Sequence, residues 1–286
     1  MALEPLDLRF QGAERVIGVY VLETDDGPAL LDCGPTTCIE TLKDGLAGRG
    51  LTLADIRHLL LTHIHLDHAG AAGVLVREHP GLQVHVSEVG APHLVDPERL
   101  EASARRLYGD TFDSLWGQLA PVPEPNVQVV GERVVGLECF PSPGHAWHHV
   151  CYVQDGTLYA GDAAGVRIQP SGFVLPPTPP PEFDLEAWNT SIEAIERRTP
   201  ERLALIHFGV ADDLDPHLAQ LRERLQVWTE LVLHGTSEQD FTAAVLDELG
   251  PEAVHYENAM PIWQSYAGLV RYREKKLERR PERSPP

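Results

Sequence analysis

The chain has 286 residues, of which 43% are hydrophobic, and a formal net charge of −20 at neutral pH. This length and composition exclude a chain that is disordered throughout, because enough apolar side chains are present to bury a core. The last sixteen residues, Arg271 to Pro286, hold seven Lys or Arg and three Glu, so the remaining residues carry −24. Nucleic-acid binding needs a basic surface that replaces phosphate counterions. The composition therefore argues against a nucleic-acid partner.

Targeting and redox signals are few. The segment Met1–Pro5 lacks the basic and apolar regions of a secretion signal, and no apolar run approaches the ~18 residues that suggest a membrane span. The cysteines form no C-x-x-C pair. We therefore expect a cytoplasmic protein without membrane contact, with reduced thiols at Cys33, Cys38, Cys139 and Cys151.

Short apolar runs typical of strands alternate with helical periodicities up to about residue 210. The predicted strands cover residues 16–22, 29–32, 58–61, 83–86, 127–130, 134–140, 149–154, 157–160 and 203–206. The predicted helical segments cover residues 36–47, 69–78, 92–119 and 186–197. An Asp-Asp-Gly turn joins the first two strands as a hairpin.

A proline-rich segment precedes the helical C-terminal part. Residues 170–181 contain six prolines, and proline lacks a backbone N–H and fixes φ, so we predict an ordered loop there. Because this loop lies in sequence between expected site residues, we expect it to form part of a pocket wall. Phe173 and Leu175 would supply the apolar face of that wall.

Beyond residue 210 the pattern becomes helical. Apolar side chains recur at steps of 4, 3, 4, 3 and 4 at Leu214, Leu218, Leu221, Leu225, Trp228 and Val232. A capping box starts a second helix at Ser237, and a third begins near Met260. We thus predict an α/β domain over residues 1–210, a helical C-terminal subdomain over 211–276, and a disordered tail over 277–286.

Metal-ligating residue types gather immediately after one short predicted strand. Four of the six residues from His63 to His68 are histidine or aspartate: His63, His65, Asp67 and His68. Imidazole and carboxylate both suit zinc, iron and manganese, so this segment indicates a site for one or two metal ions.

The string T-H-I-H-L-D-H-A-G over residues 62–70 resembles the H-x-H-x-D-H signature of the metallo-β-lactamase superfamily. Three further motifs follow in the family's order, namely Pro143-Gly144-His145, Ala160-Gly161-Asp162 and Ile206-His207, and Leu31-Asp32-Cys33-Gly34 resembles its early strand and turn. The resemblance covers roughly residues 15–210 and implies an αββα sandwich. It assigns one metal to His63, His65 and His145 and a second to Asp67, His68 and His207, with Asp162 bridging the two.

The same resemblance implies a metal-dependent hydrolase with two zinc ions, for which iron and manganese are alternatives. A bridging hydroxide would attack an ester, lactone or thioester of a small-molecule substrate, and Asp67 and Asp162 would take part in catalysis. Two other functions stay open: a mononuclear iron-dependent enzyme like the persulfide dioxygenases, and a non-catalytic metal- or ligand-binding protein. A homodimer is one candidate assembly.

Several residues outside this ligand set have two interpretations. Asp32 either orients a ligand histidine or caps backbone N–H groups in a turn, and His149 is a candidate for the same supporting position. Arg167 either binds an acidic substrate group or forms a surface ion pair, the interpretation we favour. We expect the other histidines to be surface or boundary residues: His58, His79, His85, His93, His148, His217, His234 and His255.

Overall fold

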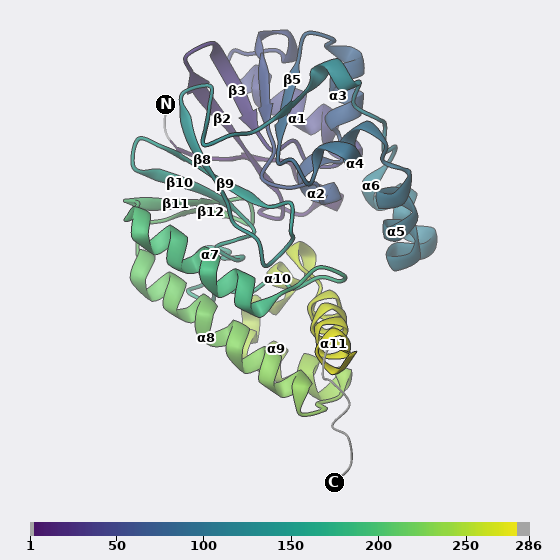
Figure 1. Ribbon diagram of the computed structural model, residues 1–286, viewed down its shortest axis with the longest axis vertical. Coiled ribbons are helices and arrows are strands. Elements are labelled where there is room, and N and C mark those ends of the chain that lie inside the picture. Colours follow the sequence, from purple (N-terminus) through teal and green to yellow (C-terminus); the bar gives the residue numbers. More distant parts are fainter. Residues whose placement is uncertain (1–2, 279–286) are drawn as a thin grey trace.

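The computed structural model describes residues 3–278 and contains two six-stranded sheets that face each other. Helices cover the outer face of each sheet, so the layers run helix, sheet, sheet, helix (Figure 1). The first sheet has the order β1 (Leu6–Asp7), β2 (Gly18–Thr24), β3 (Gly27–Leu31), β4 (His58–Leu60), β5 (Gln83–Val86) and β6 (Val127–Val129). The second has the order β12 (Gly209–Ala211), β11 (Arg202–Leu205), β10 (Thr157–Gly161), β9 (Val150–Gln154), β8 (Leu137–Pro141) and β7 (Arg133–Val134). The αββα architecture expected from the sequence is confirmed.

The two sheets combine hairpins with parallel strands. β2 and β3 form the predicted antiparallel hairpin, and β3, β4, β5 and β6 then run parallel to one another. Parallel neighbours need crossover connections, which the chain supplies as helices. In the second sheet β10 and β11 are parallel and the other pairs are antiparallel. The carboxyl ends of β4, β10 and β11 therefore carry the loops from which a shared site can be built.

The helices follow the sequence periodicity closely. Those of the first layer are α1 (Ile39–Gly48), α2 (Leu66–Ala69), α3 (Ala72–Glu78), α4 (Ala91–Val95), α5 (Glu98–Tyr108) and α6 (Phe112–Trp116). Those beyond the second sheet are α7 (Leu185–Arg198), α8 (Leu214–Leu233), α9 (Glu238–Leu249), α10 (Ala253–Ala259) and α11 (Ile262–Glu278).

Side-chain alternation along the strands divides the core in two. On β9, Val150 and Tyr152 face the first sheet, while Cys151 between them faces the helices outside the second sheet. This alternation is the period-two geometry of a strand buried on both faces. The outer core also includes the α8 stripe, from which Leu221 and Leu225 are fully buried. Helices α8, α9 and α11 thus share one core with the second sheet.

The structure differs from the predicted elements at a few places. β1 and β12 were not predicted, because strands of two and three residues show too little alternation to recognise. The predicted helical segment 92–119 is divided into three helices, since Pro97 begins a new one and Gly109 ends it at a positive φ of 55°. α11 extends through Leu277 and Glu278, the first two residues of the predicted tail, and the rest of that tail lies outside the described residues.

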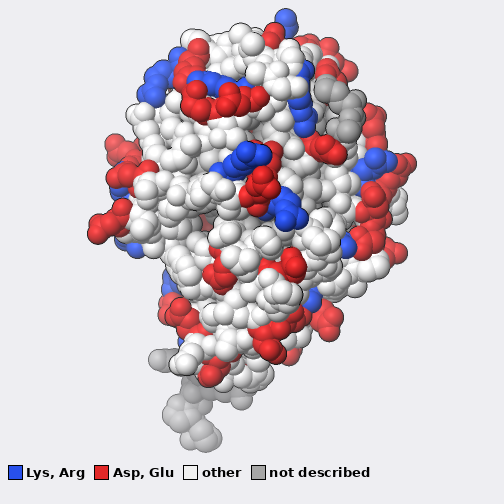
Figure 2. Space-filling view, turned by 180° about the vertical axis from the view of Figure 1, so that it is seen from behind, with Lys and Arg blue, Asp and Glu red and all other residues white. Residues whose placement is uncertain are grey.

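The surface and the thiols agree with the composition. On the face shown in Figure 2, acidic side chains are spread widely, with basic side chains between them. All four cysteines are free and buried, as expected for core thiols, and burial raises the pKa of Cys151 to about 12. Within residues 3–278, no helix is both long enough and apolar enough to span a membrane.

Candidate metal centre

The seven predicted ligands meet at one edge of the two sheets. His63, His65, Asp67 and His68 follow β4, His145 lies between β8 and β9, Asp162 follows β10, and His207 follows β11. Potential ligand atoms from these residues fall into three overlapping groups, within each of which they lie at most 4.8 Å apart. Residues separated by more than a hundred positions in the chain are thus brought to one place because parallel strands present their carboxyl ends at the same edge.

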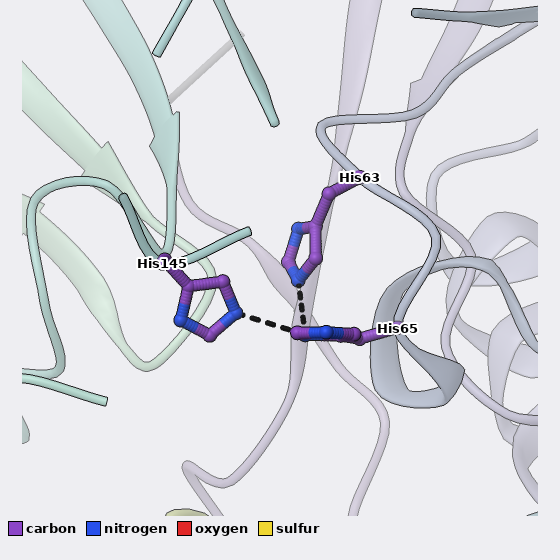
Figure 3. A group of neighbouring side chains, drawn as sticks. All are labelled: His63, His65 and His145. Atoms are coloured by element: carbon purple, nitrogen blue, oxygen red, sulfur yellow. Dashed lines mark hydrogen bonds between the residues drawn. The ribbon is translucent and has the colours of Figure 1, made fainter. Parts of the chain in front are cut away.

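Three imidazoles form the first group, and Figure 3 shows their rings converging. The Nδ1 atom of His65 lies 3.0 Å from Nε2 of His63 and 2.8 Å from Nε2 of His145. His145 donates its Nδ1–H to the carbonyl oxygen of Pro177 at 2.8 Å, so its Nε2 carries a lone pair. Lone pairs that converge in this way suit a cation placed between them.

Asp67, His68 and His207 form the second group. The Oδ2 atom of Asp67 lies 3.7 Å from Nε2 of His68 and 3.4 Å from Nε2 of His207. His207 donates Nδ1–H to the carbonyl oxygen of Val16 at 2.5 Å, and His68 donates Nδ1–H to Asp32 at 2.8 Å. Both rings therefore turn Nε2 towards Asp67.

Asp162 lies between these two groups and forms the third group with His63 and His68. Its Oδ2 atom is 3.2 Å from Nε2 of His145, in the first group. Its Oδ1 atom is 3.4 Å from Nε2 of His68 and 3.5 Å from Nε2 of His207, in the second. One carboxylate thus reaches both groups, which is the position that a bridging ligand requires.

Unsatisfied polar atoms show that this arrangement fits metal ions. His68 Nε2, Asp162 Oδ1 and His207 Nε2 are buried and have no hydrogen-bond partner. Leaving each such atom unpaired costs about 1–3 kcal/mol, and these three atoms lie together, whereas the other buried unpaired atoms of residues 3–278, on His58, Trp116 and Thr229, belong to no such group. A metal ion coordinated by all three atoms would remove that penalty.

The electrostatics of the site lead to the same conclusion. Burial by itself raises the pKa of Asp67, but His68 and His207 outweigh it and hold that pKa at about 2. Burial likewise opposes ionisation of Asp162, and the surrounding His145, His68 and His207 hold its pKa well below the usual range. Both aspartates are therefore carboxylates balanced by positive charge on the neighbouring imidazoles, and a divalent cation could supply that charge in their place.

Two supporting residues hold the ligands in place. Asp32 is fully buried; it accepts the backbone N–H and the hydroxyl of Thr62, both at 2.8 Å, in addition to Nδ1–H of His68. Asp32 therefore orients the ring of His68, as the first interpretation predicts, and the backbone N–H that it accepts belongs to Thr62 after β4 and not to its own turn. His149 accepts the backbone N–H of Asp162 on Nε2 at 3.1 Å, and its Nδ1 lies 2.7 Å from the Ser142 hydroxyl. It therefore supports Asp162 from outside the ligand set.

Glycines stand directly before two of the ligands because the chain is crowded there. At Gly161, with a φ of 50°, a Cβ atom would lie 2.6 Å from Nε2 of His149. At Gly144, with a φ of 134°, a Cβ atom would lie 2.3 Å from the Cα atom of Trp188 on α7. Only glycine permits these close approaches, which bring Asp162 and His145 to the site.

A cavity of about 400 Å³ opens above the metal-ligating residues. Among the predicted ligands, His65, Asp67, His145 and Asp162 line it. The walls come from α5, from Trp116 on α6, from residues 179–182 and from the beginning of the last helical segment. Most of the wall side chains are apolar: Ile64, Leu66, Leu100, Ala104, Leu107, Trp116, Pro179, Pro180, Pro181 and Met260. The contribution of α5 was not predicted, since a helical pattern does not reveal which neighbour its face meets.

The prediction for the proline-rich loop was partly wrong. Pro179, Pro180 and Pro181 line the cavity, as expected of this loop. Phe173 and Leu175 do not, because both are buried in the core outside the second sheet. Leu175 is held there by backbone pairing with Val166 in an isolated bridge. The mixture of apolar and proline residues in this loop could not show whether a given side chain would line the cavity or pack into the core.

Three histidines expected at the surface are buried: His85, His148 and His217. His148 accepts the backbone N–H of Ile64 on Nδ1 at 3.3 Å. Its Nε2 atom lies 3.3 Å from Oε2 of Glu182 at the cavity wall. His217 is fully buried and hydrogen-bonds the carbonyl oxygen of Ala164 at 2.7 Å. A single histidine shows no periodic pattern in the sequence, so only the fold reveals which group it contacts.

Arg167 forms the expected ion pair: its Nη1 atom lies 2.5 Å from Oδ1 of Asp213.

The fold and this cluster define a class of protein: two facing sheets with a histidine- and aspartate-rich metal centre at one edge. The family model described as the metallo-beta-lactamase superfamily matches residues 14–207. The chain belongs to this superfamily, as its motifs indicated.

Three comparisons describe its relatives. The metallo-beta-lactamase fold-containing protein ST1585 of Sulfurisphaera tokodaii is 25% identical over 222 residues, 73% of this chain and 80% of that protein. The structure of the metallo-beta-lactamase family protein TTHA1429 from Thermus thermophilus matches with a TM-score of 0.68 and 24% identity, covering 96% of this chain and 93% of that one. A hydroxyacylglutathione hydrolase of Xanthomonas campestris pv. campestris is 32% identical over 126 residues, 44% of this chain and 38% of that protein.

Proposed function

We propose that the protein is a binuclear zinc hydrolase that cleaves an ester, lactone or thioester of a small molecule. The observation that carries this proposal is the convergence of three buried, unpaired ligand atoms, His68 Nε2, Asp162 Oδ1 and His207 Nε2, beside a substrate-sized cavity. Imidazole and carboxylate donors suit zinc, and iron or manganese would also accept this donor set.

In this proposal, His63, His65 and His145 would hold one ion, Asp67, His68 and His207 the other, and Asp162 both. When bound, such ions polarise a carbonyl oxygen and lower the pKa of water to about 7, which is the chemistry that hydrolysis requires.

The chain's own part is to orient the donors. The hydrogen bonds from His145 to Pro177 and from His207 to Val16 fix each ring with Nε2 towards the centre. His65, Asp67, His145 and Asp162 face the cavity, so a substrate placed there meets the reactive edge of the centre.

A complete second group favours hydrolysis over a mononuclear iron enzyme. Asp67, His68 and His207 lie within 4.8 Å of one another in addition to the three histidines of the first group. A mononuclear centre at the three histidines would leave the Nε2 atoms of His68 and His207 unsatisfied, and one at the second group would leave the three converging histidines without an ion. A structural site binds one ion with four ligands, so it would leave some of the seven donors without a metal ion and explains them less well.

The shape of the cavity and the relatives favour an acyl substrate. Leu100, Leu107, Trp116 and Met260 give the walls an apolar character that suits an acyl chain. The similarity to a hydroxyacylglutathione hydrolase, whose name describes hydrolysis of an acylated glutathione, extends over 44% of this chain. We therefore place thioesters first among the substrates, before lactones and simple esters.

A substrate panel with a matched pair of variants tests this function. The zinc-loaded protein is assayed with a thioester, a lactone, a carboxylic ester and a phosphodiester, and we expect turnover of at least one acyl substrate. Asp162→Asn should lower kcat/KM for that substrate by at least about a hundredfold, since the bridging carboxylate is lost. Asp247→Asn removes one carboxylate from the exposed face of α9 and should leave kcat/KM unchanged. Full activity of Asp162→Asn, or turnover of no acyl substrate, would contradict the proposal.

A further inference from the structure

Helix α5 presents two arginines to the cavity. Arg99 and Arg106 both line it, together with Leu100, Ala104 and Leu107 from the same helix. The two arginines are seven positions apart, which places them on one face of the helix with their Cα atoms about 10 Å apart along its axis. The cavity therefore has cationic groups on the same wall as its apolar side chains.

These two arginines are unusual because their side chains have no partner among residues 3–278. Of the arginine side chains in residues 3–278, only those of Arg57, Arg99 and Arg106 form neither a hydrogen bond nor an ion pair. Arg105, which lies between them on the other side of α5, pairs with both Glu101 and Asp113. In a chain of net charge −20, acidic partners are plentiful. Two free guanidinium groups at one cavity thus stand out.

We propose that Arg99 and Arg106 bind an anionic group of the substrate, at a distance from the bond that the metal centre cleaves. Guanidinium groups form strong paired hydrogen bonds with carboxylate or phosphate oxygens. Both side chains are exposed, so an incoming anion reaches them without displacing an existing partner. Substrates are therefore amphipathic: the acyl group contacts the apolar wall, and the anionic group lies against α5. This inference rests on the proposed hydrolytic function, and it adds the charge of the substrate.

Binding of uncleavable analogues tests the arginines separately from catalysis. Three thioethers share a butyl group: S-butyl-N-acetylcysteamine is neutral, S-butylglutathione carries carboxylates, and S-butyl-coenzyme A carries phosphates. Calorimetry with the zinc-loaded protein measures the Kd of each. We expect at least one anionic analogue to bind at least about tenfold more tightly than the neutral one. Whichever anionic analogue binds more tightly identifies carboxylate or phosphate as the preferred group.

Charge-removing variants then assign the effect to α5. The double variant Arg99→Gln/Arg106→Gln should lose most of the preference for the anionic analogue, while its Kd for the neutral one changes less than about twofold. Arg57→Gln is the matched control, because Arg57 is also exposed and unpaired but does not line the cavity. This control should keep the full preference, which excludes a general effect of net charge. Each single variant, Arg99→Gln and Arg106→Gln, gives the same readout should the double variant fold poorly.

Two results would overturn the inference: equal affinity of the unmodified protein for neutral and anionic analogues, or an unchanged preference in the variants. Hydrolysis of the matching butyryl thioesters is measured in parallel. Charge-dependent binding of the thioethers without turnover of any thioester, lactone or carboxylic ester would contradict the proposed function and leave the anionic subsite intact. Turnover of an acyl substrate together with equal affinity for neutral and anionic thioethers would support the proposed function and overturn the anionic subsite.

Discussion

At the metal centre, the orientation of each of three histidine rings is set by a single hydrogen bond from its Nδ1–H. His68, His145 and His207 each donate Nδ1–H to an acceptor outside the centre, namely Asp32, Pro177 and Val16. Each bond selects one tautomer and points the opposite nitrogen inwards. Two of the three acceptors are backbone carbonyl groups, which substitutions do not remove. Asp32 is the exception, so its side chain is the one whose contribution can be measured directly.

Replacing Asp32 by Asn should weaken metal binding at the group formed by Asp67, His68 and His207. The amide oxygen accepts fewer and weaker hydrogen bonds than the carboxylate, so His68 would be held less firmly and would be a poorer donor. We expect metal affinity to fall about 10–100-fold, measured by competition with a chromophoric chelator. Asp213→Asn, which removes only the surface partner of Arg167, is the control. Equal affinities in the two variants would show that Asp32 does not tune the metal.

Motif spacing predicted the residues of the centre better than their surroundings. His63 to His68 form a dense local pattern, and the motifs that contain His145, Asp162 and His207 follow in the superfamily's order, so the resemblance implied that these residues share one site. His148 and His217 offered no such pattern. Their burial depends on contacts with Ile64 and Ala164, which lie far away in the chain.

At the scale of elements, the segment from Ile168 to Glu182 shows how one loop serves two surfaces. Its first half packs into the core against α8 and α10, where the ring of Phe173 lies 5.5 Å from that of Tyr256 and Arg224 lies 3.8 Å above it. Its second half, Pro179 to Pro181, forms cavity wall. Proline fixes the backbone in both halves, which lets a loop without regular hydrogen bonds hold a definite shape.

Phe173→Ala should therefore act on stability. The side chain is 8% exposed, and its removal should lower the free energy of unfolding by about 3–5 kcal/mol through lost burial and the cavity that remains. Urea unfolding monitored by circular dichroism measures the change. Leu233→Ala, at a position on α8 that is 43% exposed, should cost far less. A Phe173 variant of normal stability with an altered substrate preference would restore the original pocket assignment of this residue.

Long elements with a strong hydrophobic pattern were predictable from the sequence, whereas very short strands and the position of a helix against its neighbours were not. The stripe on α8 and the hairpin of β2 and β3 appear in the structure as predicted, because many residues contribute to each pattern. β1 and β12 have two and three residues and are defined by pairing with a neighbour. The position of α5 against the cavity likewise depends on tertiary contacts, such as the hydrogen bond from Tyr108 to Gln264 of α11 at 3.4 Å.

On the scale of the whole molecule, the metal centre joins the two sheets. The segment that follows β4 of the first sheet contributes four of its residues, and loops of the second sheet contribute His145, Asp162 and His207. Since the sheets meet through apolar side chains, opposed carboxylates and imidazoles at their edge would be costly without a cation. The two sheets thus meet at this edge through the same seven residues as the proposed chemistry.

Elemental analysis of the purified protein is the most direct test of the two-metal centre. Inductively coupled plasma mass spectrometry after zinc loading and removal of excess metal should find two zinc ions per chain. Asp162→Asn should hold fewer, because it loses the carboxylate that reaches both groups. One ion per chain, or none, in the unmodified protein would contradict a binuclear centre and with it the proposed hydrolase.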